Sequence, residues 1–146
     1  MLTFHVPGRP AAQGSKRHVG NGRFIEASKY LPAWRQAVTA QAQAIVNASD
    51  WQPADGPIQL HVDFFLARPK SVPVTKRAFR TKAPDIDKLV RAVCDALTDA
   101  EVWLDDSQVV KLISTKNYAD DVDPGCIIQV TRLTEYDEHV GGNQLL

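Results

Sequence analysis

Residues 58–66 carry the strictest hydrophobic pattern of the chain. Every second residue of this segment is apolar: Ile58, Leu60, Val62, Phe64 and Leu66. A period of two residues is typical of a β-strand that buries one face, because successive side chains of a strand point to opposite sides. The pattern therefore predicts a strand over this segment, and with it a sheet that needs a covering layer.

Two longer segments have the period of amphipathic helices. The first is expected to be capped by Ser28 and to run to about Ala48, with one apolar face: Leu31, Trp34, Val38, Ala42 and Ile45. The second is expected to end near Asp99 and has a similar face: Ile86, Leu89, Val90, Val93 and Leu97. These patterns predict the two main helices of the fold.

Shorter signals complete the chain. Three further segments have strand patterns: 2–6, 109–115 and 126–133. Gly20-Asn21-Gly22 marks a turn within a basic hairpin or flap, and a hairpin turn at Asp123-Pro124-Gly125 is expected to join the last two strands. This order of elements favours an α+β fold in which two main helices pack on one face of a mixed β-sheet.

Length and composition suit a single domain. Of the 146 residues, 44% are hydrophobic, which is enough to build a core. We expect one domain at residues 1–133 and a polar tail at residues 134–146. The two cysteines, Cys94 and Cys126, form no CxxC motif or His/Cys cluster, so neither a disulfide framework nor a zinc site is predicted. No segment resembles a signal peptide or reaches membrane-spanning length, which predicts a cytoplasmic protein.

Charge is distributed unevenly along the chain. Residues 1–84 contain 12 Lys and Arg against 4 Asp and Glu, whereas residues 85–146 contain 5 against 13, for totals of 17 and 17. Residues 67–84 have no acidic residue and six basic ones: Arg68, Lys70, Lys76, Arg77, Arg80 and Lys82. Such asymmetry indicates contact with nucleic acid, although two oppositely charged faces of an ordinary protein would give the same counts.

Asp85 and Asp87 lie at the predicted start of the second helix. On a regular helix, side chains two residues apart point about 200° away from each other and cannot share a ligand. The two carboxylates can converge if Asp85 stays extended after Pro84 while Asp87 starts the helix. Helix capping is the alternative role for either residue, because Asp is a favoured N-cap.

Asp106 is the third carboxylate of this region. The helix from Asp87 to Asp99 is roughly 20 Å long, and the seven residues that follow it span about 23 Å when fully extended. The chain can therefore just return Asp106 to the start of the helix, beside Asp85 and Asp87. A site built only from carboxylates favours Mg²⁺, with Mn²⁺ as the alternative, over zinc. Such an ion would also link the acids to the phosphates that the basic segment attracts.

Arg91 lies one helical turn after Asp87 and one turn before Asp95. The three side chains either form a surface ion-pair ladder or place Arg91 close to the chemistry. Lys88 projects about 100° away from Asp87, where it is either solvated or in contact with DNA. The acids at 120–123 lack the spacing of an EF-hand calcium loop.

The segment from Pro84 to Val110 resembles the RusA family of Holliday-junction resolvases. The matching motif reads D-x-D-K-L-V-R-A-V-x-D-A-L-T-D-A-x-V-W-L-D-D-S-Q-V-V in this chain. The order of the elements around the motif, up to the strand that ends near Leu133, extends the resemblance over most of the chain.

The resemblance implies a homodimeric, Mg²⁺-dependent endonuclease that resolves four-way DNA junctions by paired symmetric nicks, in DNA recombination and repair. Such enzymes are frequently encoded by phages or prophages, which implies the cytoplasm of a bacterial or phage-infected cell. The family's three essential acids correspond to Asp85, Asp87 and Asp106, and its essential lysine corresponds to Arg91. An Asn and a Gly of the family motif are replaced by Lys88 and Glu101.

A division of labour follows from these expectations. The three acids would bind the metal, while Arg91, with Lys88 as a second candidate, counters the charge that develops on the phosphate. The DNA backbone would be held by basic side chains of the flap, the loop and the helix: Lys16, Arg17, Arg23, Arg68, Lys70, Lys76, Arg77, Arg80, Lys82 and Lys88. Two other interpretations stay open: a branched-DNA binding module with weak or no nuclease activity, and a small phosphatase or an unrelated interaction protein.

Overall fold

The computed structural model of the chain describes residues 1–14, 16–18, 20, 24–26, 28–75 and 79–134. Residues 135–146, where the polar tail is predicted, lie outside the described residues. The elements follow one another along the chain in the order β1 (Leu2–Pro7), β2 (Lys16–His18), β3 (Phe24–Glu26), α1 (Leu31–Asn47), β4 (Ile58–Leu66), α2 (Ile86–Asp99), the 3₁₀ helix η1 (Asp106–Gln108), β5 (Val109–Tyr118) and β6 (Gly125–Arg132).

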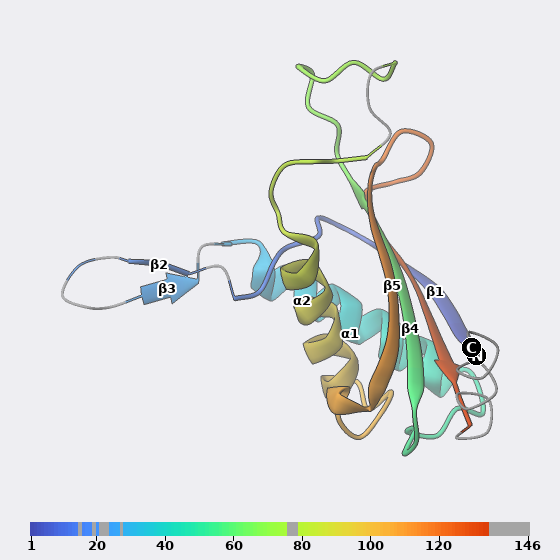
Figure 1. Cartoon of the computed structure of the whole chain (residues 1–146). Helices are drawn as coiled ribbons and strands as arrows, with labels where there is room; N and C mark the ends of the chain where they lie inside the picture. Colours follow the sequence, from blue (N-terminus) through green and yellow to red (C-terminus); the bar gives the residue numbers. More distant parts are fainter. Residues whose placement is uncertain (15, 19, 21–23, 27, 76–78, 135–146) are drawn as a thin grey trace, which may run out of the picture.

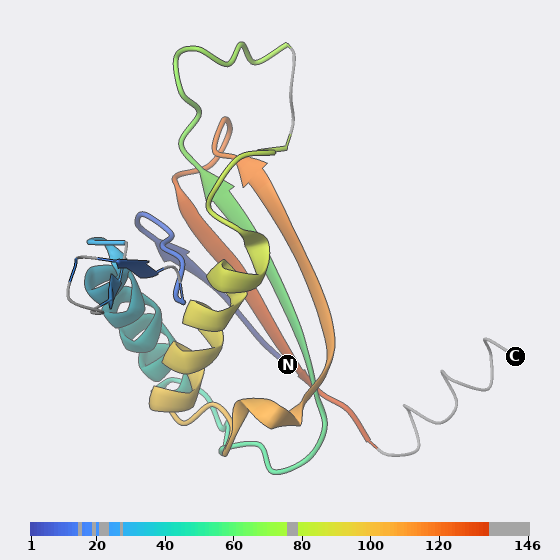
Figure 2. The ribbon, with the colours of Figure 1, turned by 60° about the vertical axis from the view of Figure 1, so that its left-hand side comes forward.

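Four strands form a mixed sheet in the order β1-β6-β4-β5. Strand β4 pairs in parallel with β5 and antiparallel with β6, and β6 pairs antiparallel with β1. Both long helices lie on the same side of this sheet (Figure 1 and Figure 2). The arrangement confirms the predicted α+β fold with two main helices on a mixed sheet.

The last two strands do not form the hairpin that Asp123-Pro124-Gly125 predicted. Strand β4 lies between β5 and β6, so the connection after β5 passes the end of β4 instead of turning back on its own strand. The cause is the segment β4–α2–β5, a crossover through a helix that makes β5 parallel to β4. The Asp-Pro-Gly sequence predicts only that the chain bends locally. The same bend also occurs in a connection between two strands that are not neighbours in the sheet.

The core lies between the sheet and the two helices. The five apolar residues of β4 identified by the sequence pattern are all buried, as are six residues of α2: Leu89, Val90, Ala92, Val93, Ala96 and Leu97. Trp34 of α1 and Trp103 after α2 are the largest buried side chains. The helical pattern therefore placed the second helix correctly, whereas the first begins at Leu31 after Tyr30, with no side-chain cap from Ser28.

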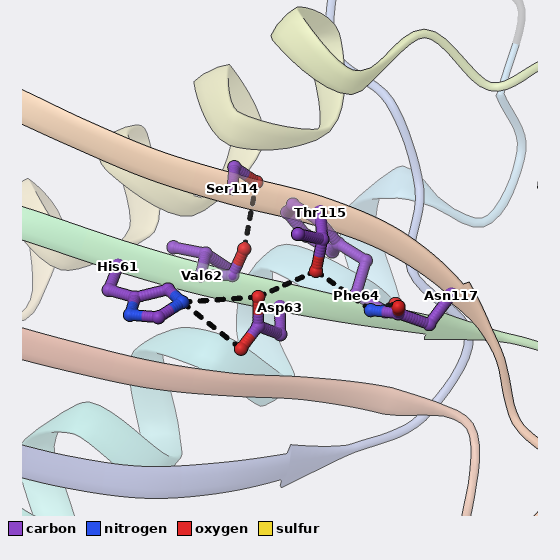
Figure 3. A network of polar contacts seen from close by, with 7 residues as sticks. All are labelled: His61, Val62, Asp63, Phe64, Ser114, Thr115 and Asn117. Carbon is purple, nitrogen blue, oxygen red and sulfur yellow. Dashed lines mark hydrogen bonds and ion pairs between the residues drawn. The ribbon is translucent and has the colours of Figure 1, made fainter. Parts of the chain in front are cut away.

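The opposite face of the sheet carries a half-exposed polar network (Figure 3). The side chain of Thr115 donates a hydrogen bond to Asp63 over 2.6 Å, and Asp63 lies 3.1 Å from a ring nitrogen of His61. Asn117 donates to Thr115 and to the carbonyl of Phe64. These contacts link β4 to the edge strand β5, and they give a structural role to His61 on a strand.

Two segments project from this body. Strands β2 and β3 pair as the predicted hairpin, which extends away from the sheet (Figure 1). Of the turn between them the structure describes only Gly20, and it does not describe the side chains of the two strands. The long loop between β4 and α2 projects from the end of the sheet at which α2 begins (Figure 2). No helix among the described residues is long and apolar enough to cross a membrane.

Candidate active site

Asp85 is the residue immediately before α2 and keeps an extended backbone, with φ −69° and ψ 138°. This is the geometry that the sequence required for Asp85 and Asp87 to project toward a common ligand. The carboxylate of Asp85 makes no cap hydrogen bond to the helix. Its closest charged neighbour is the ammonium of Lys88, at 3.5 Å. Helix capping therefore does not account for Asp85.

Asp87 and Arg91 lie on the exposed side of α2, next to the base of the β2–β3 hairpin. The backbone N–H of Gln13 donates to the carbonyl of Lys88, and the guanidinium of Arg91 extends to Gly14. A side chain at Gly14 would come within 3.1 Å of Arg91, and the residue has a positive φ of 90°, so glycine suits both the backbone and the space. Among the described residues Arg91 forms no ion pair with Asp87 or Asp95, so the ion-pair ladder is not formed.

Asp105 and Asp106 are adjacent in sequence but differ in what they contact. Asp105 precedes η1 and accepts a hydrogen bond from the backbone N–H of Ser107, while the side chain of Gln108 accepts from the backbone of Asp105. The hydroxyl of Ser107 also donates to Asp105, and these bonds lower the pKa of the Asp105 carboxyl. Asp106 takes no part in this capping box, and its side chain is exposed. Asp106 is therefore the acid of the pair that is available to a ligand.

Asp106 does not reach the start of α2. Its charge acts on the thiol of Cys94, which lies two turns beyond Asp87, or roughly 10 Å along the helix. Figure 2 shows η1 near the opposite end of α2 from Ile86. No group of three or more acidic, His or Cys side chains that could hold a metal is found in the described part of the chain. The predicted meeting of Asp106 with Asp85 and Asp87 is thus not formed within one chain.

The loop after α2 explains this placement. Glu101 adopts a positive φ of 60°, the conformation usual for the glycine that it replaces in the family motif, and ends the helix. The backbones of Val102 and Leu104 then bond to Ala54, which precedes β4. Trp103 between them is buried. Residues 102–104 are therefore held beside Ala54, near the C-terminal end of α2, and do not extend back along the helix toward Asp85.

Lys116 also contributes to this region, although the sequence analysis did not identify it. Its ammonium donates to the carbonyl of Lys82 over 2.9 Å and to the carbonyl of Pro84 over 2.8 Å. Lys116 of β5 thus holds the carbonyls of the residues on either side of Ala83, and it thereby fixes the backbone that leads into Asp85. Lys116 pairs with the buried Phe64 of the neighbouring strand β4, a register that only the structure shows.

The basic residues of the β4–α2 loop fall into different environments. Arg68 stacks on Tyr118, binds both carboxylate oxygens of Asp120 and has only 9% of its side chain exposed. This pairing raises the pKa of Arg68 and lowers that of Asp120. Lys70 and Lys82 are exposed, and Arg80 donates to the carbonyl of Ala83. Five other predicted DNA contacts lie outside the described residues or have undescribed side chains: Lys16, Arg17, Arg23, Lys76 and Arg77.

The two cysteines offer no reactive thiol. Burial raises the pKa of Cys94 to about 12, with help from the charges of Asp106 and Asp95, and burial raises the pKa of Cys126 as well. Both therefore stay protonated at neutral pH, and a protonated thiol is a poor nucleophile. The remaining candidates for chemistry at this site are the carboxylates and the basic side chains around them.

Comparison with known proteins agrees with the motif. No curated protein matches the chain. A family model described as endodeoxyribonuclease RusA matches residues 7–131, from the end of β1 almost to the end of β6. The match covers the hairpin, both helices, Asp85, Asp87, Asp106 and Lys116. This chain therefore belongs to the RusA family of endodeoxyribonucleases, which resolve Holliday junctions.

Proposed function

We propose that the protein is a homodimeric, Mg²⁺-dependent nuclease that nicks four-way DNA junctions at paired, symmetric positions. The observation that carries this proposal is the start of α2, where Asp85 occupies the cap position without capping and Asp87 follows on the exposed side of the first turn. The carboxylate of Asp85 makes no cap hydrogen bond, and its 3.5 Å ion pair with Lys88 is exposed, so the carboxylate is accessible to a ligand. Basic side chains that attract DNA flank it on the β4–α2 loop.

The donor set fits a hard divalent cation. Asp85 and Asp87 would hold the ion through carboxylate oxygens, which Mg²⁺ and Mn²⁺ prefer. When bound, such an ion polarises a phosphodiester and readies a water for attack. Arg91 has no acidic partner among the described residues, so its charge is available to a phosphate oxygen. Lys116 would keep Asp85 in place through the carbonyl of Pro84.

A second copy of the chain would complete the enzyme. Four large apolar side chains are exposed around β5: Leu104 at 66%, Val110 at 54%, Leu112 at 51% and Ile113 at 40%. Strand β5 is also an edge of the sheet, and among the described residues its outer side is bridged only at Phe79–Asn117. An open edge with apolar side chains favours pairing with another chain.

The third carboxylate would come from this second copy. Asp106 begins η1, which immediately precedes β5, and it is two residues from the exposed Leu104, where we place the dimer contact. In one chain it lies away from Asp85 and Asp87, so a two-fold dimer could supply the partner's Asp106 to each site. Two such sites, related by the dimer axis, suit two opposed strands of a junction.

A cleavage assay on DNA of different shapes tests the proposal. Four-way, forked and linear DNA are incubated with the protein, with and without Mg²⁺, and the products are separated on a denaturing gel. We expect symmetric nicks in the four-way junction that require the metal, and no nicks in linear duplex. Junction binding without nicking would instead identify a branched-DNA binding module, and absence of any DNA binding at low salt would exclude both.

A further inference from the structure

A cavity of about 870 Å³ opens directly beside the start of α2. Its wall is formed by the segment after β1, the residues before α1, the end of β4, the turn before β6 and the residues that precede Asp85. Ala83 and Pro84 belong to this wall, so the cavity lies within two residues of the candidate metal ligands. Its volume is within the range of about 300–1,000 Å³ that is typical of small-molecule sites.

The wall combines flat apolar surfaces with guanidinium groups. Four proline rings contribute to it: Pro7, Pro10, Pro84 and Pro124. The guanidinium of Arg9 stacks 3.7 Å above the ring of Tyr30, and Arg80 is oriented by a 2.8 Å bond from its Nε to the carbonyl of Ala83. Among the described residues neither arginine forms an ion pair, and Asp123 is the one acid of the wall.

We propose that this cavity receives a nucleobase that is unpaired at the branch point of the DNA, with its phosphate held by Arg9 and Arg80. This inference rests on the proposed function, because it assigns a second contact of the same substrate. Proline and tyrosine rings offer flat surfaces to the faces of a base, and base stacking on aromatic side chains is tolerant of sequence. A guanidinium without an acidic partner binds phosphate oxygens in a planar fork.

The cavity would distinguish branched from linear DNA. In a continuous duplex every base is paired and stacked, so moving one into the cavity costs the full energy of unpairing. At a branch point this cost is smallest, because stacking is already interrupted there. A base held in the cavity would fix the strand next to Asp85 and Asp87, and would thereby couple recognition of the branch to cleavage.

A binding cycle tests the inference without relying on cleavage. The protein carries Asp87→Asn so that nicking is removed, and its affinity is measured for four-way junctions with an abasic nucleotide at each position flanking the branch point in turn. Removal of the accommodated base should weaken binding by about tenfold, the scale of one base stacked on a protein side chain. The same abasic nucleotide inside an arm should have little effect.

The second half of the binding experiment changes the cavity in the protein instead of the DNA. Ala67→Trp fills the cavity from an exposed position, and Arg9→Gln removes one charge. In Ala67→Trp the abasic junction and the intact junction should bind equally well, because the base no longer has a place to enter. In Arg9→Gln the difference between them should shrink, because the phosphate that positions the base loses one of its two arginines. Ala44→Trp and Arg35→Gln are matched controls on exposed or half-exposed positions of α1 outside the cavity and should keep the tenfold difference.

The possible results separate the two proposals. An equal abasic effect in the cavity variants and in the controls, or none at any flanking position, would overturn the cavity assignment while leaving a junction nuclease intact. Failure to bind any DNA would overturn both. An abasic difference that disappears in Ala67→Trp, shrinks in Arg9→Gln and persists in both controls would support the cavity as the site of the unpaired base.

Discussion

Asp85 and Asp105 occupy the same position relative to the helices that follow them, but only Asp105 caps its helix. Asp105 and Gln108 form a complete capping box at η1, whereas the carboxylate of Asp85 makes no hydrogen bond to α2. The two residues are the same amino acid, and both have an extended backbone, with ψ 138° at Asp85 and 144° at Asp105. The difference shows that an N-cap aspartate in this chain is not automatically a structural one.

Packing explains which helix needs its cap. Helix α2 buries six side chains, so its stability comes from the core and a missing cap is tolerated. Helix η1 has three residues and buries none, so it depends on the hydrogen bonds of Asp105. A long, well-packed helix therefore leaves its first carboxylates free for another role.

The largest expected effect is at the carboxylates that do not cap. Asp85→Asn, Asp87→Asn and Asp106→Asn should each reduce the rate of junction nicking by at least about 1,000-fold, because each removes a charged metal ligand. Junction binding should be unchanged or tighter, since a repulsive charge is lost. Rates from denaturing gels and affinities from gel shifts check this. Asp105→Asn, adjacent to Asp106, is the matched control and should retain activity; a normal rate in any one of the three variants would remove that residue from the site.

Mixed subunits show whether Asp106 acts across the dimer. A dimer of one Asp87→Asn chain and one Asp106→Asn chain keeps one intact set of acids only if the partner supplies Asp106. Mixing the two inactive proteins should then restore nicking of one strand per dimer. A mixture that stays inactive, although the mixed dimers are present, would mean that each chain uses its own Asp106.

Arg91 should give the next largest effect. Arg91→Ala is expected to slow nicking by about 100-fold, the scale of removing one group that stabilises the transition state. Arg91→Lys should stay within about tenfold of the parent if the side chain acts through its charge, a change of about 1.4 kcal/mol. Single-turnover rates separate this effect from binding. If the nicking rate of Arg91→Ala is near normal while Lys88→Ala does not nick, the essential charge lies on Lys88 instead.

Lys116 should have a smaller effect because it acts through the backbone. Lys116→Met keeps the stem but removes the two hydrogen bonds to Lys82 and Pro84. We expect the single-turnover rate to fall by about tenfold, about 1.4 kcal/mol, while the affinity for the junction changes little. Lys116→Arg should recover part of the rate. An equal loss in rate and affinity would indicate a phosphate contact and not a positioning role.

The sequence predicted most of the elements but less of their arrangement. The alternation of β4 and the helical pattern of α2 were sufficient because both segments pack directly on the core. The hairpin between the last two strands was wrong because a turn motif does not reveal which strand inserts between its ends. Ser28 failed as a cap because the helix begins three residues later, at Leu31.

The local geometry at Asp85 could be predicted from the sequence, but the arrangement of the three candidate acids could not. The extended backbone of Asp85 follows from local rules, and the structure confirms it. The separation of Asp106 from Asp85 does not follow from local rules, because it depends on the hydrogen bonds of Val102 and Leu104 with Ala54. Lys116 was missed for the same reason: its partners are 32 and 34 residues away in the sequence.

The smallest expected effect is on the stability of the folded chain, and it differs between the two N-cap aspartates. Asp105→Ala should lower the denaturation midpoint by a few degrees at neutral pH, because η1 loses its cap, whereas Asp85→Ala should leave the midpoint unchanged. The pKa of Asp105 is depressed in the folded chain, so its stabilisation is fully present above the unfolded value of about 3.9 and is lost as the pH falls through the lower folded value. The difference between parent and Asp105→Ala should therefore shrink as the pH falls below about 4. Midpoints measured by circular dichroism between neutral and acidic pH check this, and an equal loss in Asp85→Ala would mean that both aspartates stabilise their helices.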